Sequence, residues 1–396
     1  MNTMLRENIH WVGYIDWTVR DFHSYITSRG ATYNAYLVCD EKTALIDTVK
    51  APFAGNLLGN IASLTKLSTV DYIVVNHAEP DHAGGLSHVV ASCPNAKVVC
   101  NKKCKDILSS YNNTTDWSFE IVKTGDAISL GKRTLTFIET PMVHWPESMF
   151  TYVPEEKLLF SMDAFGQHYA SSNRFDDEVD MHEVMEEAKT YYANIVMLYG
   201  KQISKVLEAA ARIDVEMIAP SHGVIWRSHI GEIVSAYKEW VICKPKSKVL
   251  VIYDSMWEST RKMADAIIEG ASIEGIEAKL ISVRTTGLTQ IATEVLDAAS
   301  IAFGSATLNM GMMPMMGATL TYLKGLRPCG KAGFAFGSCG WGKGGAEAID
   351  EYLKAMNIEI LREPLKCKWR PSAEVLQECR DAGKTLADRA KNITTD

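Results

Sequence analysis

The sequence predicts an α/β protein of two domains, and three observations lead to this fold class. The chain has 396 residues, which is enough for two domains of ordinary size. A polar, proline-containing segment, Cys243–Lys248, precedes a clean apolar run, Val249–Tyr253, as a linker precedes a new domain. Short strand-like runs dominate before this segment, whereas strands and helices alternate after it. We therefore predict one domain over residues 1–245 and another over residues 248–396.

The first domain is rich in short apolar runs that are typical of β-strands. They are Thr32–Val38, Thr43–Ile46, Tyr72–Val75, Lys97–Cys100, Glu120–Lys123, Thr134–Glu139, Met149–Val153 and Lys157–Phe160. Asp40–Lys42 separates two of them with turn-forming residues, which indicates a hairpin. Helical periodicity appears at Glu183–Ala193 and Ile203–Ala211. This pattern predicts a mixed arrangement with two sheets between helices.

The second domain alternates more regularly between the two kinds of element. Strand-like runs lie at Val249–Tyr253, Ala278–Val283, Ser300–Gly304 and Lys331–Gly337. Helical patterns lie at Thr260–Glu274, Ile291–Ala299 and Ser372–Lys391. Strands that are separated by helices of this length predict a parallel, doubly wound sheet.

Composition argues against several classes of function. Hydrophobic residues make up 47% of the chain and charged residues 22%, as in a globular protein with a sizeable core. The formal charge of −7 disfavours nucleic acid and anionic membranes as partners. The N-terminus has no signal-peptide pattern, and no apolar run reaches the length of about 18 residues that a spanning helix needs. We therefore expect a cytoplasmic protein.

The nine cysteines are odd in number and irregularly spaced. No C-x-x-C pair occurs, so the sequence predicts neither a disulfide framework nor a rubredoxin-type or zinc-ribbon site. Cys100 and Cys104 have the spacing of neighbours on a helix, but buried thiols explain them better. We expect most cysteines to be free and to pack as small apolar residues.

A run of six residues, His77–His82, follows the apolar run Tyr72–Val75 and contains four side chains that can bind a metal. Alternate residues of such a loop can point at two different centres. Glu79 bears on the choice of metal, because a carboxylate at this position favours iron whereas a histidine would favour zinc. Further candidate ligands, each at the end of a strand-like run, are His144, Asp163 and His222. The pattern predicts a dinuclear metal site.

Three loops at strand ends in the second domain predict a flavin site. The first, Asp254–Thr260, is rich in hydroxyl groups and precedes a helix, as loops that bind phosphate do. A single phosphate on such a loop fits FMN better than NAD or ATP, because neither the dinucleotide motif G-x-G-x-x-G nor the P-loop motif follows the strand before this loop. The candidate flavin contacts on the three loops are Ser255, Met256, Trp257, Glu258, Ser259, Thr260, Ala306, Thr307, Leu308, Asn309, Gly311, Ser338, Cys339, Gly340, Trp341 and Gly342. Trp257 or Trp341 is expected to stack on the ring.

These motifs resemble a known family. The pattern His-x-Glu-x-Asp-His with a later His, Asp and His resembles the metallo-β-lactamase fold, and its Glu variant resembles the flavodiiron proteins, also called A-type flavoproteins. Gly30–Val38 and Tyr191–Ile195 are similar to that family as well, and the first loop of the second domain is similar to that of flavodoxins. The resemblance covers essentially the whole chain. It implies a metallo-β-lactamase-like αββα sandwich followed by a flavodoxin-like sheet. Ala306 departs from the family, which commonly has Pro there.

The resemblance also implies a ligand set and a reaction. One iron takes His77, Glu79 and His144, the other takes Asp81, His82 and His222, and Asp163 bridges them. His23, His168 and Tyr192 are candidates for supplying protons or hydrogen bonds to a bound oxygen species. FMN and two irons fit a reduction of O2 to water, or of NO to N2O, and the sequence does not choose between the two.

The resemblance further implies the electron donor and the assembly. We expect a head-to-tail homodimer, which could pair further into a dimer of dimers, so that the FMN of one subunit approaches the irons of the other. Because the sequence contains neither a rubredoxin nor a flavin reductase module, we expect an external donor, such as rubredoxin or a reduced deazaflavin. Asp16–His23 is most similar to the rubredoxin:oxygen oxidoreductases, which favours rubredoxin.

Two other functions remain open from the sequence. One is a dizinc hydrolase of the metallo-β-lactamase fold with a fused flavodoxin domain, against which Glu79 and the flavin loops argue. The other is an electron carrier or sensor with a vestigial metal site, against which the complete ligand set argues.

Overall fold

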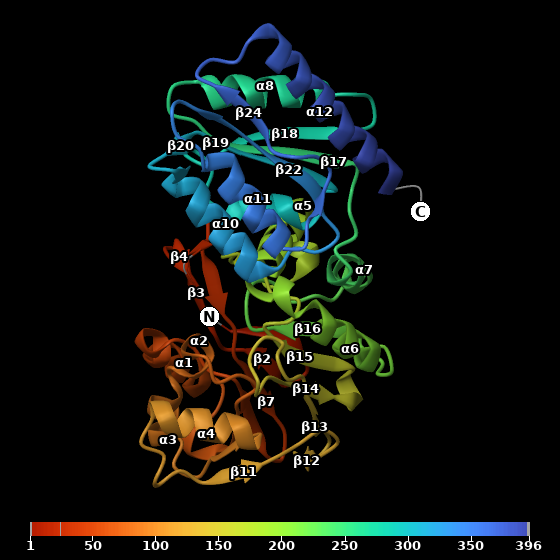
Figure 1. The fold of residues 1–396 in the computed structure, drawn as a ribbon. Coiled ribbons are helices and arrows are strands. Elements are labelled where there is room, and N and C mark those ends of the chain that lie inside the picture. The colour runs from red at the N-terminus through yellow and green to blue at the C-terminus, as the bar shows by residue number, and fades with distance from the viewer. Residues whose placement is uncertain (1, 24, 394–396) are drawn as a thin grey trace. The chain divides into compact units, whose positions relative to one another are not determined.

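The computed structural model describes residues 2–23 and 25–393 (Figure 1). Contacts divide the chain into two compact units. Unit 1 consists of Met1–Tyr191 and Lys201–Lys238, and unit 2 consists of Tyr192–Gly200 and Glu239–Asp396. The predicted linker therefore lies wholly in unit 2, and unit 2 also takes a short internal segment that the sequence did not point to.

Unit 1 contains two sheets. The larger has seven strands in the order β1-β2-β7-β8-β9-β10-β11, and the smaller has five in the order β12-β13-β14-β15-β16. The strands of the larger sheet are β1 (Thr3–Arg6), β2 (Ile9–Trp11), β7 (Tyr36–Cys39), β8 (Thr43–Ile46), β9 (Val70–Val74), β10 (Lys97–Cys100) and β11 (Phe119–Ile121). Those of the smaller sheet are β12 (Ala127–Ser129), β13 (Thr134–Glu139), β14 (Met149–Val153), β15 (Leu158–Met162) and β16 (Met217–Pro220).

Two small hairpin-like pairs complete the strands of unit 1. They join β3 (Tyr14–Asp16) with β6 (Ala31–Tyr33), and β4 (Asp21–Phe22) with β5 (Tyr25–Ile26).

The two sheets of unit 1 share one apolar core. Alternate residues of β7, β8 and β9, such as Val38, Ile46 and Val74, belong to the same buried cluster as Phe137 of β13 and Phe160 of β15. Intervening residues of the central strands, such as Leu37 of β7 and Leu45 of β8, are also buried, because helices cover the other face of the larger sheet. This sandwich with helices outside it is the arrangement that the sequence predicts.

The helices of unit 1 follow from its parallel crossovers. The strand pairs β8–β9, β9–β10 and β10–β11 are parallel, so each connection crosses over the sheet and carries a helix. Asn101 caps one of these helices by accepting a 2.9 Å hydrogen bond from the backbone N–H of Cys104. The helices are α1 (Ala54–Ala62), α2 (Pro80–Ala83), α3 (Leu86–Ser92), α4 (Lys102–Tyr111), α5 (Met181–Tyr191), α6 (Gly200–Ala210) and α7 (Ile230–Val241).

Unit 2 is a doubly wound parallel sheet. Its strand order is β18-β17-β19-β22-β23, with β24 also paired to β22, and every pairing in it is parallel. Its strands are β17 (Lys248–Asp254), β18 (Glu277–Ser282), β19 (Ser300–Ser305), β22 (Ala332–Cys339), β23 (Glu359–Ile360) and β24 (Leu365–Lys368). A small hairpin of β20 (Thr307–Leu308) and β21 (Gly311–Met312) follows β19.

Helices cover both faces of this sheet. Within unit 2, α8 and α12 lie on one face, and α10 and α11 lie on the other (Figure 1). The core beneath α8 and α12 joins Ile267 and Leu386 to Val251 of β17 and Phe334 of β22. The helices of this unit are α8 (Ser259–Ala271), α9 (Leu288–Leu296), α10 (Pro314–Leu326), α11 (Gly345–Ala355) and α12 (Ala373–Ile393).

The internal segment of unit 2, Tyr192–Gly200, continues α5 as an irregular helical turn. Asn194 anchors it to the unit, since its side-chain amide donates to the backbone oxygen of Thr289 at 3.3 Å. Its side-chain oxygen accepts a 2.8 Å hydrogen bond from the hydroxyl of Tyr322 in α10. The chain therefore changes units between Tyr191 and Tyr192.

The structure corrects the prediction for two cysteines. Cys243 and Cys329 form a disulfide bond, which the irregular spacing of the cysteines did not indicate. Tertiary packing brings them together across 86 residues, and no local motif reports such an approach. The other seven cysteines are free, as expected for most of them. Within residues 2–23 and 25–393, no helix has the length and apolar character needed to cross a membrane.

Candidate metal and flavin sites

The candidate metal ligands all come from the ends of strands in unit 1. His77 and Glu79 lie on the loop after β9, and Pro80 then begins the short helix α2, which carries Asp81 and His82. The other three follow strands of the smaller sheet. His144 comes in the turn between β13 and β14, Asp163 directly after β15, and His222 shortly after β16.

These seven residues form two adjacent groups. Ligand atoms of His77, Glu79, His144 and Asp163 all lie within 4.8 Å of one another. A second group within the same limit consists of Asp81, His82 and His222. A third group within this limit consists of His23, Glu79 and Asp81 and shares a member with each of the other two.

Asp163 faces both groups with different oxygens. Its Oδ2 lies 3.2 Å from the Nε2 atoms of both His77 and His144. Its Oδ1 lies 3.1 Å from Nε2 of His82 and 3.4 Å from Nε2 of His222. One carboxylate is therefore shared by two sets of imidazoles, which is the geometry of a bridging ligand.

Hydrogen bonds behind the cluster fix the orientation of two imidazoles. His222 Nδ1 donates to the backbone oxygen of Thr32 at 2.6 Å, so Nε2 is the nitrogen that faces the cluster. His77 Nδ1 lies 2.8 Å from Oε1 of Glu147, a fully buried carboxylate that also accepts from the N–H of Ala78 at 3.0 Å. Carboxylate and carbonyl partners of this kind are typical of histidines that bind metals.

The pKa values of the carboxylates and imidazoles in the cluster depend strongly on one another. Burial raises the pKa of Asp163, but the positive field of His82 and the close contacts of the His144 and His222 imidazoles outweigh it, so the pKa lies well below its usual range. Burial likewise lowers the pKa of His222, whereas Asp163 and Asp81 raise it to about 10. Proton and metal ion therefore compete for the same imidazole nitrogens.

The donor set fits a pair of metal ions. Both oxygens of Asp81, both oxygens of Asp163 and His82 Nε2 are buried and have no hydrogen-bond partner among the described residues. Their distances of 3.1 to 3.4 Å from neighbouring ligand atoms suit donors around a shared ion. Ligands held about 2.1 Å from an ion at right angles lie about 3 Å apart. Four imidazoles with three carboxylates are a mixed nitrogen and oxygen set, which suits iron.

The three candidate proton donors lie in different surroundings. His23 Nε2 is 2.7 Å from Oε1 of Glu79 and is about one-third exposed. His168 is buried, its Nδ1 bonds the hydroxyl of Tyr25, and its ring lies 5.0 Å from that of His222. Tyr192 is buried in unit 2, where its ring lies 5.2 Å from that of Trp240.

Sequence reasoning missed two residues of this site. Glu147 supports His77 but has no ligand-like spacing to the other candidates, so no local pattern in the sequence pointed to it. Tyr191, the neighbour of the predicted Tyr192, has its ring 5.0 Å from His168 and 6.0 Å from His222. Asp47, directly after β8, supports the loop that carries His77, because it accepts hydrogen bonds from the backbone N–H of Asn76 at 2.8 Å and from its side chain at 3.0 Å.

The three predicted flavin loops lie at one edge of the sheet of unit 2. They follow β17, β19 and β22, which are neighbours, and the register pairs Asp254 with Ser305 at the ends of the first two. The buried hydroxyl of Thr260 bonds that of Ser338 at 2.8 Å and joins the first loop to the third. The N–H of Gly345 donates to Thr307 Oγ1 at 3.2 Å and joins the third to the second.

The residues of these loops fit FMN. The hydroxyls of Ser255, Ser259 and Thr260 lie at the N-terminus of α8, a helix of 13 residues whose first N–H groups attract a phosphate. Trp257 is 83% exposed and Trp341 is 90% exposed, so both indoles are available to a flat ring.

A cavity of about 230 Å³ adjoins the third loop. Its lining consists of Thr307, Gly337, Ser338, Cys339, Lys343, Ala346, Glu347, Lys366, Cys367 and Lys368. The last three belong to β24, a strand that the sequence analysis did not predict. Trp369, just after this strand, is 56% exposed, and its ring lies 5.8 Å from that of Trp341.

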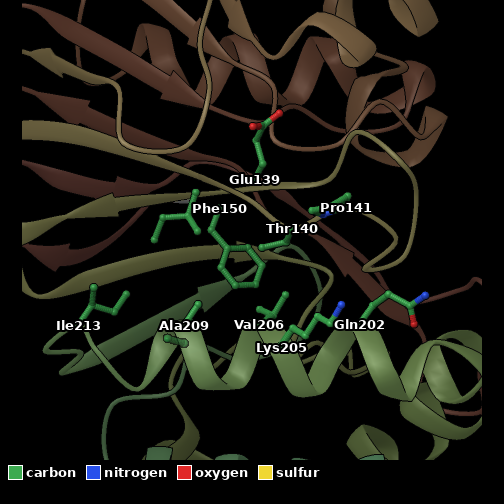
Figure 2. Close-up of a pocket in the computed structure, with 11 residues that line it drawn as sticks. Glu139, Thr140, Pro141, Phe150, Gln202, Lys205, Val206, Ala209 and Ile213 are labelled. Carbon is green, nitrogen blue, oxygen red and sulfur yellow. The ribbon is translucent and has the colours of Figure 1, made fainter.

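A second cavity, of about 250 Å³, lies in unit 1 between the smaller sheet and α6 (Figure 2). Phe150 points toward the helix, where Val206 and Ala209 complete an apolar wall. None of the predicted metal ligands lines it, so this cavity is separate from the metal cluster.

Two family models match separate parts of the chain. The family described as ODP family beta lactamase matches residues 31–223, and the flavodoxin family matches residues 251–383. A nitric oxide reductase of Moorella thermoacetica is 46% identical over 390 residues, which are 97% of this chain and 98% of that protein. The anaerobic nitric oxide reductase flavorubredoxin of Pectobacterium atrosepticum is 40% identical over 98% of this chain and 77% of its own length.

Solved structures of similar proteins have the same fold. The rubredoxin oxygen:oxidoreductase of Desulfovibrio gigas has a TM-score of 0.97 and 40% identity, with all of both chains covered. The flavodiiron protein of Giardia intestinalis has a TM-score of 0.97 and 38% identity, and the match covers 100% of this chain and 98% of that one. The predicted fold class, a metallo-β-lactamase-like sandwich followed by a flavodoxin-like sheet, is confirmed.

Proposed function

The chain belongs to the flavodiiron protein family, and from this premise we propose that it reduces O2 to water, NO to N2O, or both. Membership makes the chain an oxidoreductase with FMN and two iron ions as its cofactors. When bound, FMN takes up electrons and passes them singly to the iron pair, which supplies the redox chemistry.

The shared carboxylate of Asp163 supports a two-iron site most strongly. In the proposal, His77, Glu79 and His144 hold one iron, and Asp81, His82 and His222 hold the other. Asp163 joins them, because its two oxygens face different sets of imidazoles. Bound in this way, the iron pair would supply a site at which a small substrate can bind and react.

Three side chains have proposed roles in supplying protons or hydrogen bonds to the substrate. His168 is the best placed, because the hydroxyl of Tyr25 occupies its Nδ1 and leaves Nε2 as the other bonding atom. Among the described residues, Nε2 has no hydrogen-bond partner. His23 contacts Glu79 and shares this role, and Tyr192 remains a candidate on the resemblance alone.

The flavin is proposed to lie in the domain of residues 248–396, and the irons in the domain of residues 1–245. Its phosphate binds the loop of residues 255–260, and its ring lies against residues 306–311 and 338–342. The hydrogen bonds that join these loops support one common site.

Electrons are proposed to come from rubredoxin or another small external donor in the cytoplasm. A head-to-tail homodimer would bring the FMN of one subunit to the irons of its partner. Sedimentation analysis tests the assembly, and a fully active monomer would contradict it.

Donor-coupled consumption of O2 and of NO tests the proposed reaction. Protein with its iron and FMN is supplied with reduced rubredoxin, and each gas is followed with an electrode. Glu79→His is the informative variant, because a histidine in place of the carboxylate favours zinc over iron. We expect it to lose reductase activity and to gain zinc. Unchanged O2 and NO consumption by the variant would contradict the role of Glu79.

A further inference from the structure

Two cysteines that the proposed function does not use lie side by side in unit 2. Cys243 follows α7 and precedes the linker of residues 244–247, and Cys329 lies between α10 and β22. They are bonded to each other, with their Cα atoms 5.7 Å apart, which is within the usual span of a disulfide. The bond therefore attaches the start of the linker to the turn that leads into β22.

The two cysteines differ in their exposure to solvent. Cys243 is only 3% exposed, and its backbone N–H donates to the oxygen of Trp240 at 2.9 Å. Cys329 lies in the loop between α10 and β22, and it is the one exposed cysteine of the nine. A small thiol or disulfide in solution therefore approaches the pair from the side of Cys329 and not from that of the buried Cys243.

The disulfide lies at the N-terminal ends of the strands, whereas the flavin loops lie at their C-terminal ends. Cys243 precedes β17 and Cys329 precedes β22, whereas the first and third flavin loops follow the carboxyl ends of these strands. Non-covalent contacts also hold the end of the linker. The N–H of Lys246 donates to the backbone oxygen of Asp297 at 2.8 Å, its ammonium lies 3.2 Å from that carboxylate, and the backbone oxygen of Ser247 accepts from the N–H of Glu277 at 2.9 Å. Opening the bond thus removes the covalent anchor at the start of the linker and leaves the flavin loops intact.

We propose that Cys243 and Cys329 are a site of reversible thiol–disulfide exchange that locks the linker, residues 244–247, onto the flavodoxin-like unit. This inference is independent of the reaction at the irons. Disulfides inside cells are mostly transient or redox-sensing, and an exposed one is open to attack.

The exchange needs a small disulfide as its oxidant, such as oxidised glutathione. The thiolate of Cys329 attacks one sulfur of that disulfide, which releases one small thiol and leaves a mixed disulfide. The sulfur of Cys243 then attacks the sulfur of Cys329, so the protein disulfide forms and a second small thiol leaves. Two electrons pass from the protein to the oxidant, and the two protons of the protein thiols end on the released thiols.

Thiol counting on the folded holoprotein tests the site. The protein is incubated with oxidised or with reduced glutathione, the exchange is stopped with acid, and the free thiols are titrated after denaturation. We expect seven free thiols after oxidation and all nine after reduction. Peptide mapping should then join the peptides of Cys243 and Cys329.

Variants test whether the difference of two free thiols between the oxidised and the reduced protein comes from Cys243 and Cys329. Cys329→Ser removes an exposed side chain, so it should fold, and it should give the same count after both treatments. Cys39→Ser is the matched control, because Cys39 is a half-buried free cysteine of unit 1 and its loss keeps the difference at two. Nine thiols in the oxidised wild type, or a persistent difference in Cys329→Ser, would overturn the proposal, as would a bond that reduced glutathione does not open.

Limited proteolysis tests whether the disulfide restrains the linker. The side chain of Lys246 is 66% exposed, so trypsin can recognise the bond between Lys246 and Ser247. We expect cleavage there to be at least threefold faster in the reduced protein than in the oxidised protein, and unaffected by redox state in Cys329→Ser. Equal rates in the two forms of the wild type would show that the disulfide does not restrain the linker.

Discussion

The metal cluster and the flavin loops are built in opposite ways. In unit 1 the ligands are buried or half-buried, and a further layer of side chains, including Glu147 and Asp47, holds the loops that carry them. In unit 2 the flavin loops expose Trp257 and Trp341 and are tied to one another by single hydrogen bonds.

This difference indicates how each site should respond to change. A buried cluster of three carboxylates and four imidazoles depends on every member, because loss of one leaves the charge of the others uncompensated. The flavin loops present separate contacts to a large ligand, so each contributes a smaller part of the affinity. Substitutions should therefore reduce iron content steeply in unit 1 and flavin affinity gradually in unit 2.

The largest effect is expected for Asp163→Asn. The amide keeps the volume of the side chain but removes the charge shared by the two groups of imidazoles. Iron content should fall from about two to below one per chain, and reductase activity by on the order of 100-fold or more, with FMN content unchanged. Metal analysis measures the iron content, and flavin absorbance measures the FMN content. Asp214→Asn, at a carboxylate that is 70% exposed, is the control, and full iron retention in Asp163→Asn would refute the bridging role.

A smaller loss is expected for Glu147→Gln. This positioning residue acts through His77 and does not face the cluster itself. Removal of its charge should weaken iron binding by about 10-fold and be visible in a competition with a chelator. Glu216→Gln, at an exposed carboxylate of unit 1, should bind iron as the wild type does. If Glu147→Gln also binds iron as the wild type does, the contact of Glu147 with His77 is not needed for the site.

Thr260→Val should affect the flavin and not the metal. It removes the hydroxyl that joins two flavin loops and leaves that of Ser338 without its partner. We expect FMN to bind about 10-fold more weakly, measured by fluorescence titration of the deflavinated protein, because one buried hydrogen bond is lost. Thr319→Val is the control, since this hydroxyl bonds within its own helix, α10, at 2.9 Å. Equal affinities of Thr260→Val and the wild type would show that the loops bind separately.

The smallest effect is expected for Trp341→Ala. Stacking of one exposed indole contributes about 0.5–1.5 kcal/mol, so the FMN dissociation constant should rise only a few-fold. Trp17→Ala removes an indole of unit 1 that is 53% exposed and should leave the constant unchanged. A loss of more than about 100-fold in Trp341→Ala would mean that the flavin site depends on single residues, as the metal site does.

The sequence indicates the metal ligands more clearly than the side chains that hold those ligands in place. The run His77–His82 and the later ligands stand at strand ends, where local patterns report them. Glu147 and Tyr191 reach the cluster through tertiary packing, and their neighbours in the sequence give no sign of it. The disulfide of Cys243 was missed for the same reason.

Elements were predicted where their periodicity is clean. Strands such as Thr134–Glu139 and Met149–Val153 were predicted with their observed bounds. The helix α10 was not predicted, because its own apolar residues occur on all of its sides, which weakens the helical periodicity of the sequence. The strand β24 was not predicted because it has only four residues, two of them lysines. Short or evenly apolar elements need the rest of the fold to define them.

The metal and flavin content of the protein, purified under conditions that retain iron, tests the central claim most directly. We predict about two iron ions and one FMN per chain, with the iron lost in Asp163→Asn and the flavin retained. Zinc in place of iron, with no flavin bound, would contradict the proposed reduction of O2 or NO and would point to a hydrolase instead.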